Sequence, residues 1–247
     1  RIAEILSSVD ASIQATQAVI EQAERVKRGL IEELLTGGLG SEAIERGEVP
    51  DGWEATTIGA VCEIARGGSP RPIDKFMTDE EDGINWIKIG DASASSKYIY
   101  TTKEKIKPEG EKKSRRVHAG DFLLSNSMSF GRPYILRTDG CIHDGWLSLS
   151  FDRQKLGEEF LYYLLSSPLV FNQFSDKAAG SAVKNLNKDL VASVSIALPP
   201  YEEQKRIEKV LSDVDALIQS QHALTEQQNR TKRGLMDDLL TGKVRTV

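Results

Sequence analysis

The sequence has few of the residues that usually carry catalysis or hold metal ions. It contains two cysteines and three histidines among 247 residues. Cys62 and Cys141 cannot build a disulfide framework and suit a reducing compartment, so we expect a cytoplasmic protein. No run of about 18 apolar residues is present, which argues against a membrane-spanning helix. The net charge of −5 gives the chain no general affinity for nucleic acid.

Catalytic motifs are missing as well. The sequence has no phosphate-binding P-loop, no glycine-rich methyl-donor loop and no Asp/Asn-Pro-Pro-aromatic motif of amino-methyltransferases. Pro50-Asp51 has no partner motif of a nuclease site, and the pair Cys141 and His143 falls short of a zinc site. We therefore predict a chain that is not an enzyme, holds no metal and binds no cofactor itself.

What the sequence does contain is a long internal repeat. Residues 1–37 and 206–242 are identical at 21 of 37 aligned positions, at a constant offset of 205. Neither copy contains proline, and both end in Leu-Leu-Thr-Gly, which is typical of a helix that glycine terminates. Each copy predicts one helix of roughly 55 Å. Because other residues separate the end of one copy from the start of the other, we expect an antiparallel pair.

Apolar residues recur along each copy in steps of three and four, which predicts one buried seam per helix. Polar residues, among them Thr16, Lys27, Gln228 and Lys232, interrupt the seam. They are either exposed to solvent or fix the register and orientation of the pair. The predicted seam residues are Ile2, Leu6, Val9, Ile13, Ile20, Ala23, Leu30 and Leu34 in the first copy and Ile207, Leu211, Val214, Ile218, Leu235 and Leu239 in the second.

Between the copies the pattern changes to short β-rich runs divided by turns. We predict an α+β protein, with one mixed α/β domain flanked by two long antiparallel coiled-coil helices. The first arm covers residues 1–37, a linker 38–54, the domain 55–200 and the second arm 201–247. Strands are expected within residues 57–65, 84–90, 97–102, 121–127, 133–138, 141–151 and 191–198, and helices within 157–169, 169–176 and 187–191.

Four polar segments punctuate the domain. Residues 65–72 offer glycine amides and arginines that suit phosphate oxygens. Residues 97–116 carry eight basic and three acidic groups, residues 125–132 carry groups that suit base edges, and residues 179–187 are small and polar. Each segment alone can be an ordinary surface loop, but four in a domain without a catalytic site favour DNA recognition. The candidate DNA-contacting residues are Arg66, Gly67, Gly68, Ser69, Arg71, Lys97, Lys112, Lys113, Arg115, Arg116, Ser125, Asn126, Ser127, Ser129, Arg132, Gly180, Ser181, Lys184, Asn185 and Asn187.

The most distinctive passages lie at the ends of the arms and at the edges of the domain. They are LPPYEEQKRIEKVLSDVDALI and KRGLMDDLLTGKVR in the second arm, RIAEILSSVDASI and KRGLIEELLTG in the first, and VPDGWEATTIGAVCEIARGGSPRP and GSAVKNLNKDLVASVSIALPP in the domain. With these passages the whole chain resembles the specificity (S) subunit of type I restriction-modification systems.

The resemblance implies a non-catalytic subunit that binds double-stranded DNA. Two recognition domains in this family each read one half of a split site, and two antiparallel helices separate them. Methyltransferase (M) subunits dock on the helices, restriction (R) subunits join the assembly, and S-adenosylmethionine, ATP and Mg²⁺ belong to those partners. Only one recognition domain is present here, so the chain resembles a half-subunit. We expect either a natural chain that continues upstream of Arg1 or a halved one, and we expect a homodimer of half-subunits.

Two other functions remain open from the sequence. One is a DNA methyltransferase that carries such a recognition domain, against which the missing methyl-donor motifs count. The other is a structural coiled-coil adaptor, which salt-sensitive and sequence-selective DNA binding would exclude. The DNA sequence that the chain reads cannot be predicted, because base contacts depend on loop geometry.

Overall fold

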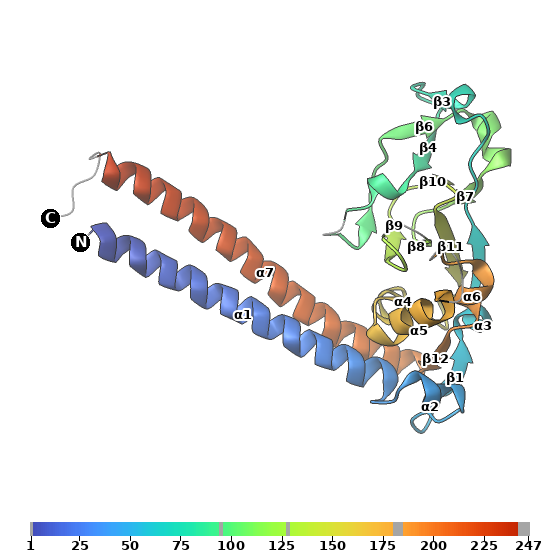
Figure 1. The fold of residues 1–247 in the computed structure, drawn as a ribbon, viewed down its shortest axis with the longest axis horizontal. Helices are drawn as coiled ribbons and strands as arrows, with labels where there is room; N and C mark the ends of the chain where they lie inside the picture. The colour runs from blue at the N-terminus through green and yellow to red at the C-terminus, as the bar shows by residue number, and fades with distance from the viewer. Residues whose placement is uncertain (1, 94–95, 127–128, 180–184, 242–247) are drawn as a thin grey trace. The chain divides into compact units, whose positions relative to one another are not determined.

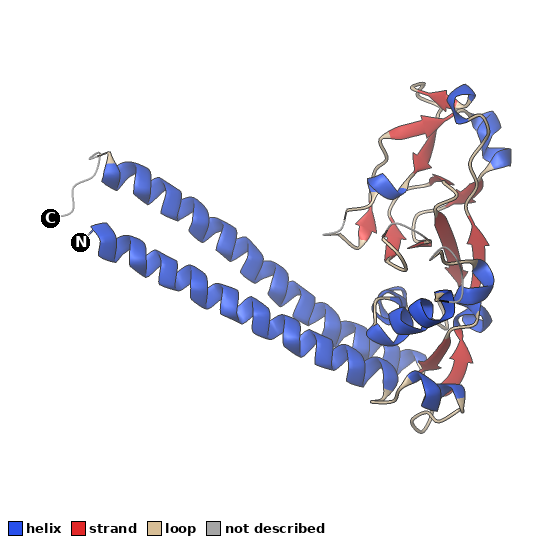
Figure 2. Cartoon of the chain, in the orientation of Figure 1, coloured by secondary structure: helices blue, strands red, loops and turns tan. Residues whose placement is uncertain are grey.

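The computed structural model describes residues 2–93, 96–126, 129–179 and 185–241. The chain divides into two compact units, one from residues 1–31 and 209–247 and one from residues 32–208. Figure 2 shows that the strands all belong to the second unit, whereas the described part of the first unit is helical. Among the described residues, no helix combines the length and the apolar character needed to cross a lipid bilayer.

Two long helices lie where the repeat predicts them. Helix α1 spans Ile2–Thr36 and helix α7 spans Tyr201–Leu240. α1 is followed by Gly37 in the left-handed conformation, with φ of 62°, as its terminating position requires. Within the first unit the two helices run side by side in opposite directions (Figure 1). The predicted antiparallel pairing is therefore confirmed.

Two ion pairs fix the register of this helix pair. Lys27 Nζ lies 2.5 Å from Asp215 Oδ1, and Lys232 Nζ lies 2.5 Å from Asp10 Oδ1. The two lysines are equivalent positions of the repeat, and so are the two aspartates. The same contact therefore forms twice, once toward each end of the pair. A shift of one helical turn would break both contacts, so the polar seam residues set the register.

The predicted seam is buried or partly buried at every position. One detail at the end of α1 is wrong. Leu30 and Leu34 are only partly buried, whereas Ile31 is 8% exposed and Leu35 is fully buried. In the register that the two ion pairs set, Ile31 lies level with Leu211 and Leu35 with Ile207, and both of these α7 residues are buried.

Strands of the second unit form three sheets. One five-stranded sheet has the order β3-β6-β4-β10-β7, another has the order β2-β11-β8-β9-β5, and β1 pairs with β12. Most neighbouring strands are antiparallel, while β4 pairs with β10 and β5 with β9 in parallel. The strands are β1 Glu54–Thr57, β2 Cys62–Arg66, β3 Met77–Thr78, β4 Ile84–Ile87, β5 Tyr98–Ile99, β6 Glu104–Ile106, β7 Arg115–Val117, β8 Phe122–Ser125, β9 Pro133–Leu136, β10 Gly140–Ile142, β11 Trp146–Phe151 and β12 Ser195–Leu198.

Short helices complete the second unit. The α-helices are α2 Ser41–Glu45, α3 Ile58–Val61, α4 Glu158–Leu165, α5 Pro168–Ala178 and α6 Lys188–Ala192, and the 3₁₀ helices are η1 Ile73–Lys75, η2 Ile89–Asp91 and η3 Pro108–Lys113. With the strands they confirm the predicted α+β class, a mixed domain flanked by long helices.

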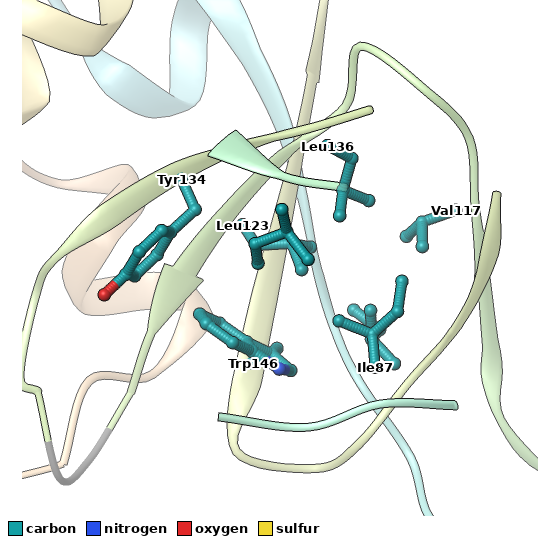
Figure 3. Close-up of a cluster of buried hydrophobic side chains, with 8 residues drawn as sticks. Ile87, Val117, Leu123, Tyr134, Leu136 and Trp146 are labelled. Carbon is teal, nitrogen blue, oxygen red and sulfur yellow. The ribbon is translucent and has the colours of Figure 1, made fainter. Parts of the chain in front are cut away.

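A buried cluster joins the two larger sheets. Ile87, Val117 and Ile142 come from the first of them, and Leu123 and Trp146 come from the second. Figure 3 shows Ile87, Val117, Leu123 and Trp146 pointing toward one another, together with Tyr134 and Leu136. Tyr134 and Trp146 meet edge to face, with ring centroids 5.6 Å apart. Burial of these large apolar side chains stabilises the arrangement of the sheets.

Several predicted elements have different bounds in the structure: the strand run at 191–198, for example, begins inside α6, and the run at 97–102 is a strand only at Tyr98–Ile99. The run at 57–65 is divided by α3, because Gly59 lies against Ala192 and a Cβ there would approach the Ala192 Cβ to 2.7 Å. The run at 141–151 is two strands, β10 and β11, separated by a turn at 143–145. The helix predicted at 157–169 ends at Leu165, and a new helix, α5, begins at Pro168.

The first turns of α7 cap another helix of the second unit. Gln204 Oε1 accepts a hydrogen bond of 2.9 Å from the Gly157 amide, and Glu208 Oε1 accepts one of 2.9 Å from the Phe160 amide. These amides lie at the N-terminus of α4, where helix amides have no partner in their own helix. Burial raises the pKa of the Glu208 carboxyl above its usual value, although the Phe160 hydrogen bond opposes the shift.

Candidate nucleic-acid interface

The connection between β10 and β11 gathers several of the polar segments. The amides of Gly67 and Gly68 donate to the carbonyls of Trp146 and Ile142, at 2.9 and 3.1 Å. The Ser114 hydroxyl, beside the basic end of η3, also donates to Ile142 O, at 3.1 Å. Residues 66–72 and 111–116, which the sequence marks separately, are therefore attached to the same connection.

The loop after β8 is attached there too. The Asn126 amide donates to Gly145 O at 3.0 Å, and its side-chain Nδ2 donates to Asp144 O at 2.9 Å. The carbonyl of Asn126 accepts from the Leu186 amide at 2.9 Å, which brings the segment before α6 to the same place. Three polar segments and the end of a fourth thus converge around the turn at 143–145.

A carboxylate lies at the centre of this arrangement. Asp144 Oδ1 accepts from Ser69 Oγ at 3.1 Å, and Asp144 Oδ2 accepts from Arg71 at 3.3 Å. The Arg66 Nε lies 3.5 Å from the Asp144 carbonyl oxygen. His143 Nδ1 accepts from the Gly145 amide at 3.0 Å, and its Nε2 lies 2.8 Å from Asp144 Oδ1. We call Arg66, Ser69, Arg71, His143 and Asp144 the Asp144 cluster.

The cluster borders open space. A hollow of about 590 Å³ is lined by Ser69, Arg71, Trp86, Lys88 and His143, among others. The Arg71 side chain is 81% exposed and that of Asp144 is 33% exposed. A ligand can therefore reach these groups without displacing the core.

The glycines of the first loop have a different role from the one expected. The sequence offered the amides of Gly67 and Gly68 as free phosphate donors, but both donate to carbonyls inside the domain. Gly67 is needed for close approach, because a Cβ there would lie 2.1 Å from the His143 carbonyl oxygen. The two glycine amides are therefore already occupied within the domain.

Two residues of the loop after β8 use their side chains for hydrogen bonds inside the domain. Ser125 is fully buried, and its hydroxyl donates to Ser129 O at 2.5 Å. Asn126 is 5% exposed and uses its side-chain amide on Asp144 O. Neither side chain presents a group to a base in this arrangement. Ser129 itself is partly buried and accepts from the Arg132 amide at 3.1 Å.

The basic segment presents exposed cations next to the cluster. Lys112, Lys113, Arg115 and Arg116 are all exposed. Lys113 lies over the Phe76 ring, 4.7 Å from its centroid, and Arg116 lies 3.8 Å from Glu111. The latter distance describes a loose surface pair, which contributes little to stability and can exchange for another anion.

Lys97 is separated from this group by its own contacts. Its Nζ lies 2.5 Å from Glu159 Oε2 and faces the rings of Tyr98, Tyr162 and Tyr163. Burial alone would lower the pKa of Lys97, but the hydrogen bond and charge of Glu159 outweigh it and raise the pKa. This side chain stabilises the packing of α4, so we do not carry it into the proposed interface.

The remaining candidates are divided between two places and the residues left undescribed. Arg132 lies over the Tyr134 ring and lines a hollow of about 480 Å³ with Phe130 and Phe171. Asn187 caps α6, since its side chain accepts from the Leu190 amide at 2.8 Å, and Asn185 is exposed. Outside the described residues lie Ser127, Gly180, Ser181 and Lys184.

Sequence reasoning missed His143 and Asp144. Both lie within a run that was interpreted as one strand, although its Asp-Gly dipeptide is a turn signal. Taking that signal into account would have placed a turn there. The contacts of Asp144 with residues 69 and 71, more than 70 positions away, could not have been predicted. Within the part of the chain that the structure describes, no three His, Cys, Asp or Glu side chains form a metal-binding group.

Comparison with known proteins decides the family. Residues 50–229, which include the whole convergence of loops, match the family described as type I restriction modification DNA specificity domain. The chain belongs to this family. A specificity domain is a recognition module, so the family confirms the predicted non-catalytic role.

Individual relatives agree with this assignment. The type I restriction enzyme MjaVIII specificity subunit of Methanocaldococcus jannaschii is 28% identical over 99% of this chain and 60% of that protein. The MjaIX specificity subunit of the same organism is 27% identical over 73% of this chain and 42% of that protein. The solved HsdS subunit from Thermoanaerobacter tengcongensis has the same fold, with a TM-score of 0.71 and 20% identity over 96% of this chain and 55% of that one. The chain therefore spans about half the length of these relatives.

Proposed function

We propose that this chain is the sequence-specific DNA-binding subunit of a type I restriction-modification complex. In this role it directs methyltransferase and restriction subunits to a split DNA site. The observation that carries the proposal is the convergence of separate polar loops on the turn at 143–145, in a chain of the specificity family. S-adenosylmethionine, ATP and Mg²⁺ belong to the partner subunits in this proposal.

The chemistry of the exposed groups fits double-stranded DNA. Arg71, Arg115 and Arg116 are exposed cations that suit phosphate oxygens. Ser69 and Asp144 carry polar groups that suit base edges. Because cations surround polar groups, the surface can position itself on the backbone and read bases at the same time. The net charge of −5 is no obstacle, since binding depends on the local field.

The arms are the proposed assembly surface. Two apolar positions per heptad are enough to pair two helices, but three heptads of each arm carry a third, exposed apolar residue, which is typical of a larger bundle. On each helix these apolar residues form a row one position before the seam. In an antiparallel pair the two rows therefore lie on the same side of the seam and form one apolar stripe. The exposed apolar residues at seven-residue spacing are Ile5, Val19 and Val26 on α1 and Val210, Leu217 and Leu224 on α7.

A second copy of the chain fits this stripe. The register of the two ion pairs places Val19 level with Leu224 and Val26 level with Leu217, so the stripe has its own approximate two-fold symmetry. A two-fold dimer would match it with an identical surface. M subunits would then dock on the outside of the resulting bundle.

The oligomeric state of the chain tests whether the arms form the proposed dimer. Light scattering at micromolar concentration should give about twice the chain mass of 27.3 kDa. Replacing Val19 and Leu224 together with glutamate should return the mass to that of one chain without unfolding the helices. A parent mass that stays near 27.3 kDa as the sample is concentrated would contradict the dimer.

Methylation mapping tests the function. The chain is reconstituted with its cognate M subunit and S-adenosylmethionine, and methylated positions on genomic DNA are sequenced. We expect methylation at one split sequence, with both halves identical if two copies of the chain assemble. Methylation without sequence preference would contradict the specificity role. Methylation by this chain alone would instead support a methyltransferase.

A further inference from the structure

A carboxylate in a DNA-binding surface repels the phosphate groups of DNA and weakens binding unless it makes a favourable contact of its own. Asp144 lies among Arg66, Arg71 and His143, on the turn where the polar loops converge. Phosphate groups that approach the two arginines would meet its negative charge at close range. The position is therefore costly for general DNA affinity, and it needs an explanation that binding to phosphate does not supply.

The partners of the two carboxylate oxygens differ. Oδ1 accepts from Ser69 Oγ at 3.1 Å and lies 2.8 Å from His143 Nε2, so it faces two polar groups of the domain. Among the described residues, Oδ2 has one donor, Arg71, at 3.3 Å. That arginine is 81% exposed, and exposed ion pairs contribute little free energy. Oδ2 is thus an oriented acceptor whose partner is easily exchanged.

We propose that Asp144 is a specificity-determining residue, whose Oδ2 accepts a hydrogen bond from an exocyclic amino group of the target DNA. The candidates in the major groove are N4 of cytosine and N6 of adenine, the two amino groups exposed there. When the base amine replaces Arg71 at Oδ2, the guanidinium moves to a neighbouring phosphate. This inference rests on the proposed function and adds the group that reads one base pair.

The same carboxylate explains rejection of other sequences. Where guanine O6 or thymine O4 faces Oδ2, two acceptors meet and the carboxylate loses a partner without gaining one. Arg71 then stays on Asp144, and its contact with phosphate is not made. Affinity for the wrong sequence falls on both counts, so Asp144 contributes selectivity by penalising mismatches.

His143 and Ser69 position this acceptor. The Gly145 amide donates to His143 Nδ1 at 3.0 Å and so orients the ring, whose Nε2 lies 2.8 Å from Oδ1. Ser69 follows the two glycines whose amides are tied to β10 and β11. The carboxylate orientation is therefore determined by backbone that does not depend on DNA.

The experiment uses the full chain and a pool of random-sequence duplexes. Sequences bound by the parent and by Asp144→Asn are selected and compared, and affinities for the preferred duplex and a scrambled one are measured at several salt concentrations. The substituted asparagine keeps an acceptor oxygen but loses the charge, so the scrambled duplex should bind more tightly. The ratio of the two affinities should fall about tenfold, with relaxed preference at one base pair.

Two further variants sharpen the comparison. Arg71→Ala should weaken binding to the preferred duplex and leave the scrambled one nearly unchanged, because the guanidinium reaches phosphate only where a base amine replaces it at Oδ2. Glu42→Gln, on the exposed face of α2, removes the same charge away from the cluster and should change neither affinity. If Asp144→Asn does not fold, Asp144→Glu is measured in its place. It keeps the charge but moves the oxygens by one methylene, and it should also lower the ratio.

Each outcome is decisive. Unchanged selectivity in the Asp144 variants overturns the proposal, and so does an equal loss on every duplex, since that would make Asp144 a brace. Both results leave the proposed function standing as long as the parent selects a sequence. If the parent itself enriches no sequence from the pool, the proposed function fails instead.

Discussion

The two copies of the repeat have nearly the same sequence but end in different environments. Ile31 and Leu35 near the end of α1 are 8% and 0% exposed. Their counterparts in α7, Met236 and Leu240, are 37% and 64% exposed. The twin ion pairs, in contrast, form at equivalent positions of both copies. The residues that the two copies share therefore determine that each copy forms a helix and in which register the helices pair. Burial at the end of each helix depends instead on the domain attached to it.

Charge insertion at the two helix ends should have the most unequal effects. Leu35→Asp places an unpaired charge in a fully buried site and should cost about 3–5 kcal/mol in free energy of unfolding. Leu240→Asp should change it by less than about 0.5 kcal/mol. Chemical denaturation of both variants measures the difference, and equal effects would show that the two ends are buried alike.

One position inside the arm refines the same comparison. Leu30→Asp should still cost several kcal/mol, because Leu30 lies on the seam and is partly buried. Ile31→Asp should cost more, because Ile31 is the better buried of the two. A Leu30→Asp variant that unfolds like the parent would show that the seam is misassigned.

Charge reversal should lower DNA affinity when it is made in the recognition domain but not when it is made in the arms. Replacing Arg115 and Arg116 with glutamate should weaken binding to every DNA sequence by about tenfold or more and flatten its salt dependence. The same change at Arg230 and Arg233, which are exposed on α7, is the matched control and should leave DNA affinity nearly unchanged. Equal losses in both variants would move the DNA contact onto the arms.

The capping carboxylate of α7 has no counterpart in α1, where the equivalent residue is Ala3. Glu208→Ala should cost about 1 kcal/mol, since it leaves the Phe160 amide without its partner, whereas Glu208→Gln keeps an acceptor. Because the folded pKa is raised, the protonated form stabilises the fold below the ordinary value of 4.5, and this stability is lost as pH rises through the raised pKa. The parent should therefore lose stability relative to Glu208→Gln over that window in a pH series of thermal melts.

The twin ion pairs should show the smallest difference. Asp215→Asn should cost about 1 kcal/mol and Asp10→Asn somewhat less, because the Asp215 side chain is 23% exposed and that of Asp10 is 45% exposed. Exchanging Lys27 and Asp215 for each other should restore the loss. If the exchange does not restore it, the pair does not set the register.

Much of the architecture was predictable because it is local. Helical periodicity, the absence of proline and the terminal glycine are properties of the arm sequence itself, and Pro199-Pro200 marks the start of α7. The short helix α3 was not predictable, since Ile58–Val61 has a strand-like composition and is shaped by contact of Gly59 with Ala192. Burial of Leu35 rather than Leu34 also depends on neighbours distant in sequence.

The candidate site was predictable in composition but not in geometry. Arg66, Ser69 and Arg71 were identified by residue type and do lie together. Lys97 was chosen by the same reasoning, yet it is paired with Glu159 and surrounded by tyrosines. Asn126 has the right chemistry to read a base but is used as a brace. Residue type shows which chemistry is available, and only the fold shows which groups are already occupied.

The central claim is that residues 55–200 choose the DNA sequence while the arms assemble the complex. The most direct measurement exchanges these residues for the matching domain of another specificity subunit and maps methylation by the complex with its M subunit. The account predicts that the methylated sequence changes to that of the donor domain while assembly is retained. An unchanged methylated sequence would contradict it.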